Sequence, residues 1–204
     1  MSAFLDTYFY NFDVTILSLF GKLEHPIFTS IAEFVSKFGT YNAFYSYCAI
    51  AIFLCLFKKT RKFGVPMTIS IAIGSILTNK ILKPCVGRLR PYEGLIDTEF
   101  FANFKAMYEA VGSPIVAEKS WPSGHTTLLF DVTVPLAFIF WHENKKYISA
   151  ILLAFATTVA LSRIYLMVHY PTDVLAGFII GAFAGIIGYY STKRKFETTK
   201  NKLH

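Results

Sequence analysis

The stretch SRIYLMVHYPTD, from Ser162 to Asp173, places an arginine, a histidine and an aspartate within a dozen residues. Two apolar runs flank it, Tyr147–Leu161 and Val174–Thr192, and neither contains Asp, Glu, Lys or Arg. Each run is close to the ~17–25 residues that a membrane-spanning helix needs. In a membrane chain, charges between such segments lie at a water boundary or in a protected polar cavity. The stretch therefore predicts a polar turn between two spanning helices.

Three further runs have the same apolar character. Thr40–Phe57 and Phe63–Asn79 are uncharged, and Thr126–Trp141 contains only Asp131. Charged residues make up 16% of the chain, against about 25% in soluble domains, which disfavours a soluble fold. The sequence predicts an all-α integral membrane bundle with five strong spans, organised as a single domain over residues 1–204.

The first 38 residues predict short amphipathic helices in front of these spans. Ser2, Asp6 and Asp13 fall on one helical face, and aromatic and aliphatic residues fill the others. A helix that lies in the membrane interface fits this pattern better than a sixth span, so the bundle is expected to have five to six transmembrane helices. Pro26 interrupts the chain, and a second, shorter helix is expected over Ile27–Phe38.

Basic residues are concentrated in two short connections and in the C-terminal tail, residues 193–204. Five spans would place all three on one side of the membrane, and the positive-inside rule makes that side cytoplasmic. The extracytoplasmic side would receive an acidic loop over residues 93–121. The net charge of +7 is thus a topology signal and an anionic-lipid contact, and no nucleic-acid partner is expected. The basic residues are Lys58, Lys59, Arg61, Lys62, Lys145, Lys146, Lys193, Arg194, Lys195, Lys200 and Lys202.

Three polar segments reach the extracytoplasmic side in this topology: KPCVGRLRP at Lys83–Pro91, PSGH at Pro122–His125, and the opening stretch. Clustered arginines and lysines repel one another unless they bind an anion, and their geometry suits the oxygens of a phosphate. A Ser-Gly pair before a helix adds backbone N–H groups that favour the same ligand. The charged and titratable side chains are Lys83, Arg88, Arg90, Arg163, His125, His169 and Asp173.

Two histidines suit phosphoryl transfer without a metal, because one can attack phosphorus and the other can protonate the leaving oxygen. Asp173 follows His169 by four residues and can fix its tautomer. Each residue alone also has a structural explanation. Arg163 and Asp173 could form an ion pair at a helix boundary. His125 could cap a helix, and Ser162 could bond within its own helix. These explanations weaken together, because they would have to coincide on one membrane face.

The three segments resemble the signature of the type 2 phosphatidic acid phosphatase superfamily, the integral membrane lipid phosphate phosphatases. That signature reads Lys, six residues, Arg-Pro; then Pro-Ser-Gly-His; then Ser-Arg, five residues, His, three residues, Asp. All of its positions are present between Lys83 and Asp173.

The resemblance implies that His169 is the nucleophile and forms a phosphohistidine, that Asp173 orients it, and that His125 is the general acid. The implied phosphate ligands are Lys83, Arg90, Ser123, Gly124 and Arg163. Two further candidates are Ser162, whose hydroxyl has no defined role, and Arg88, which lies outside the signature. No metal and no cofactor is implied.

The expected activity is hydrolysis of a terminal phosphate on a lipid, in the cell membrane, with the active site facing outward and the C-terminus in the cytoplasm. Undecaprenyl pyrophosphate, phosphatidylglycerol phosphate and phosphatidic acid all fit, and family analogy favours a polyprenyl pyrophosphate or a broad range of lipids. The alternatives are a non-catalytic lipid-phosphate-binding membrane protein, a haloperoxidase-like vanadate-binding enzyme, and a metal hydrolase. The cations disfavour a bound divalent ion. The sequence defines neither the substrate nor the oligomeric state.

Asp131 is an isolated carboxyl group in an apolar span, where an unpaired charge is expensive. It is expected to be protonated or hydrogen-bonded to Ser75, Thr78 or Asn79 on the neighbouring span, in preference to acting as a proton relay.

The acidic loop is expected to form a lid or rim over the site. Five of its apolar side chains are expected to dip into the lipid headgroup layer: Phe100, Phe101, Phe104, Met107 and Tyr108.

Overall fold

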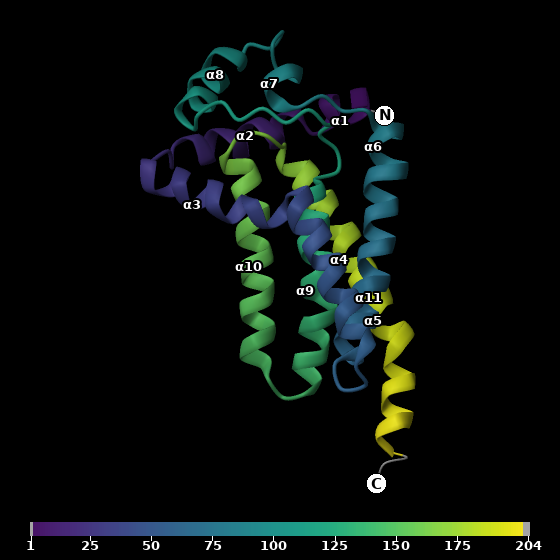
Figure 1. Cartoon of the computed structure of the whole chain (residues 1–204). Helices are drawn as coiled ribbons and strands as arrows, with labels where there is room; N and C mark the ends of the chain where they lie inside the picture. The colour runs from purple at the N-terminus through teal and green to yellow at the C-terminus, as the bar shows by residue number, and fades with distance from the viewer. Residues whose placement is uncertain (1, 202–204) are drawn as a thin grey trace.

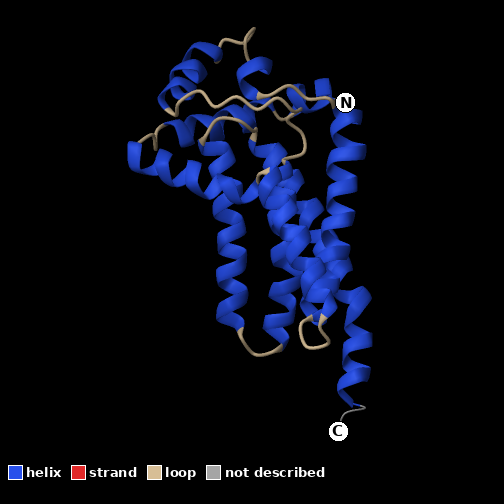
Figure 2. Cartoon of the chain, viewed as in Figure 1, coloured by secondary structure: helices blue, strands red, loops and turns tan. Residues whose placement is uncertain are grey.

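The chain consists of helices and loops throughout the residues that the structure describes, 2–201, and its side chains are described as far as residue 192 (Figure 2). In this computed structural model, long helices run side by side and short helices cover one end of them (Figure 1). The prediction of an all-α membrane bundle is confirmed. The elements are α1 (Ser2–Tyr8), α2 (Tyr10–Gly21), α3 (Pro26–Ser36), η1 (Lys37–Gly39), α4 (Tyr41–Leu56), α5 (Arg61–Ser75), η2 (Ile76–Leu82), α6 (Lys83–Val86), α7 (Pro91–Gly94), α8 (Phe101–Ala110), α9 (Gly124–His142), α10 (Lys146–Tyr165) and α11 (Pro171–Asn201).

Within residues 2–201, four helical segments are long and apolar enough to cross a membrane: Arg61–Gly94, Gly124–His142, Lys146–Tyr165 and Pro171–Thr192. A fifth span results when α3, η1 and α4 are taken as one segment with a bend of 48°. α4 alone has 16 residues, which is fewer than the ~20 that cross a bilayer. Four of the five predicted spans are thus present as unbroken segments, and the fifth, predicted over Thr40–Phe57, is long enough only when α3 and η1 are counted with α4.

α1 and α2 lie across one end of the bundle (Figure 1). With 7 and 12 residues, neither is long enough to span a bilayer, as the prediction of interfacial helices requires. The chain break predicted at Pro26 is also present. α3 begins there, and the ring of His25 accepts a hydrogen bond from the backbone N–H of Ile27 (3.2 Å).

The second span continues beyond the predicted Asn79, because α5 passes through a π-helical segment, η2, into α6. Gly87 ends it at φ 64°, in the left-handed region that only glycine adopts without strain. The chain then crosses the end of the bundle through Arg88 and Arg90 before α7 begins.

α9 and α11 pack closely, because a stripe of glycines on α11 faces α9. A Cβ atom on Gly177 or Gly181 would lie 2.6 Å from the carbonyl oxygen of Ser123 or Thr127, respectively. Small residues in this spacing let membrane helices approach each other. The first turn of α11 is thereby held against the first turn of α9.

The acidic loop forms a cap of short helices over the same end as α1 and α2 (Figure 1). Its aromatic side chains point inward: Phe104 is fully buried and stacks with Tyr108, which also stacks with Tyr92. They pack in one apolar cluster with Leu17 of α2. The expectation that Phe104 dips into the headgroup layer is therefore wrong, because α2 supplies a buried apolar surface for it.

The two ends of the bundle differ in charge. The three polar segments lie at the capped end, and the α4–α5 and α9–α10 connections, which carry basic residues, lie at the other (Figure 1). The side chains of the predicted basic tail, residues 193–204, lie outside the described part of the chain.

Candidate active site

A cavity of about 1020 Å³ lies at the capped end and extends between α4, α5, η2 and α9. Its walls bring together residues from all three polar segments, which are far apart in the sequence. The predicted site residues that line it are Lys83, Arg90, Gly124, His125, Arg163 and His169.

His169 lies in the turn between α10 and α11 and is 2% exposed. Its Nδ1 is 3.3 Å from Asp173 Oδ2 and 3.4 Å from Ser120 Oγ. Its Nε2 is 3.1 Å from Arg90 Nη1. Because a carboxylate only accepts hydrogen bonds and a guanidinium only donates them, Nδ1 carries the proton and Nε2 presents its lone pair. The lone pair thus belongs to Nε2, where it accepts a hydrogen bond from Arg90 Nη1 of the cationic wall.

The surroundings of His169 also favour its neutral form. Burial lowers the pKa of the imidazole well below its usual value, and the positive charges of Arg90, Arg163 and Lys83 lower it further. A neutral imidazole in a fixed tautomer is the form that can attack an electrophile.

Asp173 is fully buried in the first turn of α11. Besides facing His169, its Oδ2 accepts hydrogen bonds from Ser120 Oγ (2.5 Å) and from the backbone N–H of Tyr170 (3.0 Å). Its Oδ1 accepts a hydrogen bond from Arg88 Nη1 at 2.7 Å. These donors fix the rotation of the carboxylate and therefore the edge that it presents to His169.

Arg90 and Lys83 form one side of the cationic wall. Arg90 donates from Nε to the carbonyl oxygen of Glu118 and from Nη1 to that of Val168, both at 2.7 Å. Its Nη2 makes no hydrogen bond within the described residues. Lys83 forms an ion pair with the carboxylate of Glu118, whose pKa is raised by burial. Lys83 therefore already faces an anionic oxygen, which is the kind of partner that a phosphate supplies.

Arg163 approaches from the end of α10 and is 5% exposed. Its Nη1 donates to Ser36 Oγ of α3, whereas its buried Nε has no partner among the described residues. The alternative of an ion pair between Arg163 and Asp173 is wrong, because the carboxylate is taken by Arg88. A buried donor without a partner costs about 1–3 kcal/mol, so its presence points to a ligand.

His125 lies in the first turn of α9, and its ring packs against Gly39 of η1. A Cβ atom at position 39 would come within 2.5 Å of His125 Cδ2, so only glycine fits beside the ring. The neighbouring Gly124 faces Lys83: a Cβ there would lie 3.5 Å from Nζ. The first backbone N–H groups of a helix have no partner within the helix. Those of α9 begin at Gly124, next to the ammonium group of Lys83.

Two signature serines do not line the cavity. Ser123 is fully buried behind it, donates its backbone N–H to the carbonyl oxygen of Asp173 (3.0 Å), and accepts a hydrogen bond from Thr126 Oγ1 (3.0 Å). Ser162 Oγ donates to the carbonyl oxygen of Val159 at 2.7 Å, which is the alternative of a bond within its own helix. Both side chains therefore serve the framework in this structure.

Arg88 also lies outside the cavity, on the far side of Asp173. Its Nε, Nη1 and Nη2 donate to the carboxylates of Asp6, Asp173 and Asp13, respectively. The prediction that it binds phosphate is wrong, because these acids occupy all three nitrogens.

Asp131 lines the deep part of the cavity and is 1% exposed. Its carboxyl group lies against Gly74 of α5, and its Oδ1 has no hydrogen-bond partner among the described residues. The predicted bonds to the neighbouring span are absent; Thr78, for example, bonds to Thr127 at 3.1 Å. The alternative of a protonated carboxyl stays a prediction.

Several residues of the site carried no signal in the sequence. Ser120 and Glu118 lie in an irregular loop, and Ser36 and Gly39 precede the first predicted span. Asp13 did carry one, because it is the one charged residue of α2.

Comparisons with known proteins identify the family of this chain. Residues 63–197 match the model of the PAP2 superfamily. An undecaprenyl-diphosphatase from Sulfolobus acidocaldarius is 27% identical over 177 residues, which cover 87% of this chain and 77% of the relative. A lipid A 4'-phosphatase from Bacteroides thetaiotaomicron is 26% identical over 88% of this chain and 76% of the relative.

The fold has also been seen in a solved structure. A transmembrane PAP2 type phosphatidylglycerolphosphate phosphatase from Bacillus subtilis superimposes with a TM-score of 0.74, covering 95% of this chain and 90% of that one. At 22% sequence identity this likeness concerns the fold alone. The family model spans well over half of the chain and contains all three polar segments. The resemblance seen in the motifs is thus confirmed, and the chain belongs to the PAP2 superfamily of membrane phosphatases.

Proposed function

We propose that the protein removes the terminal phosphate of a lipid phosphate or diphosphate through a phosphohistidine on His169. The observation that carries this proposal is the orientation of that ring. Nδ1 faces Asp173 and Nε2 faces the cationic wall of a large cavity. A phosphoryl group bound to the cations would meet the lone pair of Nε2.

In the first step, His169 Nε2 attacks phosphorus, and the P–O bond to the leaving group breaks. His125 gives a proton to the departing oxygen, which leaves as an alcohol or, from a diphosphate, as a phosphate monoester. The positive charge of the phosphorylated imidazole is stabilised by Asp173 at Nδ1.

In the second step, water attacks the phosphorus of the phosphohistidine. His125, now neutral, takes a proton from this water, the P–N bond breaks, and inorganic phosphate leaves. His169 is restored with its lone pair on Nε2, and His125 is restored as an acid.

The phosphoryl oxygens would be bound by Lys83, Arg90 and Arg163 together with the first N–H groups of α9, beginning at Gly124. Arg163 Nε is a buried donor without a protein partner in the described residues, and the hydrogen bonds of Arg90 leave from its Nε and Nη1. Preorganised donors of this kind stabilise the charge that develops on a transferring phosphoryl group. Ser123 would contribute through the position of its backbone at the start of α9.

For the substrate we propose a polyprenyl diphosphate, with other lipid phosphates as weaker substrates. The relatives include enzymes named for undecaprenyl diphosphate and for lipid A, which carry phosphate on large apolar bodies. The cavity continues past His125 to Phe44, Leu128 and Asp131, so it offers room beyond the phosphate.

We further propose that the active site opens to the extracytoplasmic side. The two connections with basic residues lie at the opposite end of the bundle, and such loops remain in the cytoplasm. A matched pair of single cysteines tests this in a background lacking Cys48, Cys55 and Cys85. A membrane-impermeant thiol reagent on intact cells is expected to label Ile115→Cys, where the native side chain is 84% exposed, and to spare Lys59→Cys. Labelling of the second variant alone would reverse the topology.

The catalytic proposal is tested by phosphate release from polyprenyl diphosphate, phosphatidylglycerol phosphate and phosphatidic acid by purified protein. Activity is expected to survive excess chelator, to fall with vanadate, and to disappear in His169→Ala. His142→Ala, at the opposite end of α9, is the matched control and is expected to retain activity.

Labelled phosphate should be trapped as an acid-labile adduct on the native protein and not on His169→Ala. Trapping at native levels on that variant would overturn the assignment of the nucleophile. Loss of activity with chelator, restored by one divalent ion, would favour a metal hydrolase.

A further inference from the structure

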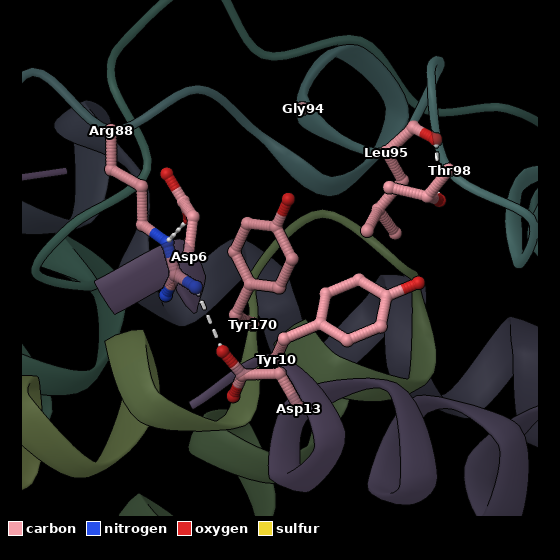
Figure 3. A pocket seen from close by; sticks show the side chains of 8 residues that line it. All are labelled: Asp6, Tyr10, Asp13, Arg88, Gly94, Leu95, Thr98 and Tyr170. Atoms are coloured by element: carbon pink, nitrogen blue, oxygen red, sulfur yellow. Dashed lines mark hydrogen bonds and ion pairs between the residues drawn. The ribbon is translucent and has the colours of Figure 1, made fainter. Parts of the chain in front are cut away.

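Behind the cavity, a second cluster of charges connects the N-terminal helices to Asp173. Arg88 is its centre and is 1% exposed. Its Nε donates to Asp6 Oδ1 (2.8 Å), its Nη2 to Asp13 Oδ2 (2.8 Å), and its Nη1 to Asp173 Oδ1 (2.7 Å). Figure 3 shows Asp6 and Asp13 converging on the guanidinium beside Tyr170, whose ring centroid is 3.8 Å from Arg88 Cζ. One cation thus holds three carboxylates from three separate segments of the chain.

Asp13 is fully buried and reaches from α2 to the start of α11. Its Oδ1 accepts the backbone N–H of Thr172 (3.0 Å), and its Oδ2 accepts Thr172 Oγ1 (2.8 Å) as well as Arg88. The N–H groups in the first turn of a helix lack partners within the helix and favour a negative charge. Asp13 therefore caps, from a distant helix, the helix that carries Asp173.

These contacts hold two neighbouring residues of the same short segment, and Arg88 Nη1 also donates to Thr172 Oγ1 (2.8 Å). Asp13 holds the backbone at Thr172, and Arg88 holds one oxygen of the next side chain, Asp173. The other oxygen of that carboxylate, Oδ2, is thereby left facing His169 Nδ1 at 3.3 Å. A rotation of the carboxylate or a shift of the first turn would change this contact and with it the direction of His169 Nε2.

We propose that Asp13 and Arg88 are positioning residues of the reaction: together they fix Asp173 and, through it, the nucleophile. This inference rests on the proposed function of His169. Neither residue belongs to the three-part signature, and Asp13 lies before the matched residues 63–197. Helix α2 is therefore part of the catalytic framework as well as a cover for the bundle.

The test compares Asp13→Asn and Arg88→Lys with the native full-length protein in phosphate-release kinetics. Asn keeps an acceptor for the Thr172 N–H but loses the charge that faces Arg88. Lys keeps the charge of Arg88 but cannot donate to three carboxylates in a planar arrangement. Removing a group that orients a functional residue typically lowers activity by about 10–100-fold. We expect kcat to fall by this factor in both variants, and KM and inhibition by inorganic phosphate to stay within about twofold of native, since the phosphate ligands are untouched.

The control is Glu109→Gln, which removes a carboxylate that is 61% exposed on α8 and is expected to leave kcat unchanged. A thermal melt of each variant shows that assays are run well below unfolding. Native kcat in a folded Asp13→Asn or Arg88→Lys protein, with only a lowered melting temperature, would reduce the cluster to a purely structural role. If Asp13→Asn does not fold, Arg88→Lys decides.

His169→Ala separates the two proposals. An active His169→Ala protein would refute the phosphohistidine itself. An inactive His169→Ala protein beside fully active Asp13→Asn and Arg88→Lys proteins would refute only the positioning role.

Discussion

Arg88 and Arg163 are two buried arginines at the same end of one bundle, and they differ in how their donors are used. Arg88 donates from all three nitrogens to carboxylates and packs against the ring of Tyr170. Arg163 has one neutral partner, Ser36, and a buried Nε without any partner in the described chain. The nitrogens of Arg88 are thus all bonded to carboxylates of the protein, whereas Arg163 keeps a donor that is available to an anion.

The difference separates two uses of a buried cation. Buried polar groups are nearly always satisfied, so the paired Arg88 belongs to the framework, whereas the unpaired Nε of Arg163, a cation that lines the cavity, is suited to an anionic ligand. From the sequence, Arg88 and Arg163 were both candidates for phosphate binding. Substituting Arg163 should therefore affect mainly activity, whereas substituting Arg88 should affect both stability and kcat.

The largest expected effect is the loss of activity in Arg163→Met. Removing one preorganised donor to a developing oxyanion lowers kcat by about 10²–10³-fold, and the cation is lost as well. The melting temperature should fall only slightly, because the substitution removes one hydrogen bond to a neutral side chain, Ser36, and the buried Nε contributes none to the fold. Phosphate-release kinetics check the fall in kcat, and a thermal melt of the same purified sample checks the stability. Ser36→Ala is the matched control, and a melting temperature far below native in Arg163→Met would remove the distinction from Arg88.

Arg88→Met should lower stability in addition to the fall in kcat expected for Arg88→Lys. It would leave Asp13 and Asp173 buried beside each other without their cation, and breaking a buried ion pair from one side costs about 3–5 kcal/mol. Denaturant titration of the detergent-solubilised protein should show this shift. A native midpoint would mean that the three carboxylates do not depend on Arg88 for their burial.

The pH dependence of kcat/KM distinguishes the two arginines further. The pKa of His169 is lowered by burial, Arg90, Arg163 and Lys83, so its neutral form persists below pH 6.5, its ordinary pKa. We expect the acid limb of kcat/KM to lie below this pH in the native enzyme. The limb should move upward in the residual activity of Arg163→Met and stay in place in Arg88→Lys, since Arg88 is not among the charges that lower this pKa.

The phosphate of the substrate also titrates, so the pH profile is measured with a phosphate monoester and with a diphosphate. An acid limb that lies at the same pH for both substrates is assigned to the enzyme. An acid limb at or above pH 6.5 in the native protein would contradict the assignment.

The smallest effect is expected at Asp131, a buried acid whose Oδ1 also lacks a partner among the described residues. It lies deep in the cavity against Gly74, away from the cationic wall, so Asp131→Asn should fold and keep kcat within about twofold of native. Asp131→Leu serves as the apolar comparison. A folded Asp131→Asn protein that binds substrate but turns it over a hundredfold more slowly would make this residue a proton relay.

Hydropathy and spacing predicted the spans and the charged and titratable part of the cavity wall that the three motifs supply, because those signals are local. Lys83, Arg90, His125, Arg163 and His169 each sit within a short motif at the end of an apolar run. Five spans were enough to bring these ends together, so their convergence followed from topology.

The partners of Arg88 could not be predicted in the same way. Asp13 and Arg88 are 75 positions apart, and nothing local distinguishes an arginine that binds phosphate from one that binds carboxylates. Ser120, which holds Asp173, comes from an irregular loop whose path depends on the packing of α8 against α2. Such contacts are decided by tertiary structure alone.

The contact between Gly39 and His125 limits what sequence motifs can say about related chains. Gly39 lies outside the residues matched by the family model, yet a single methyl group there would overlap the ring of the proposed general acid. A descendant with alanine at this position would keep every motif residue and the whole bundle while its acid was displaced. Motif searches would count that chain as an enzyme. In this superfamily, a glycine that no motif contains can thus decide whether a chain is an active phosphatase or an inactive homologue.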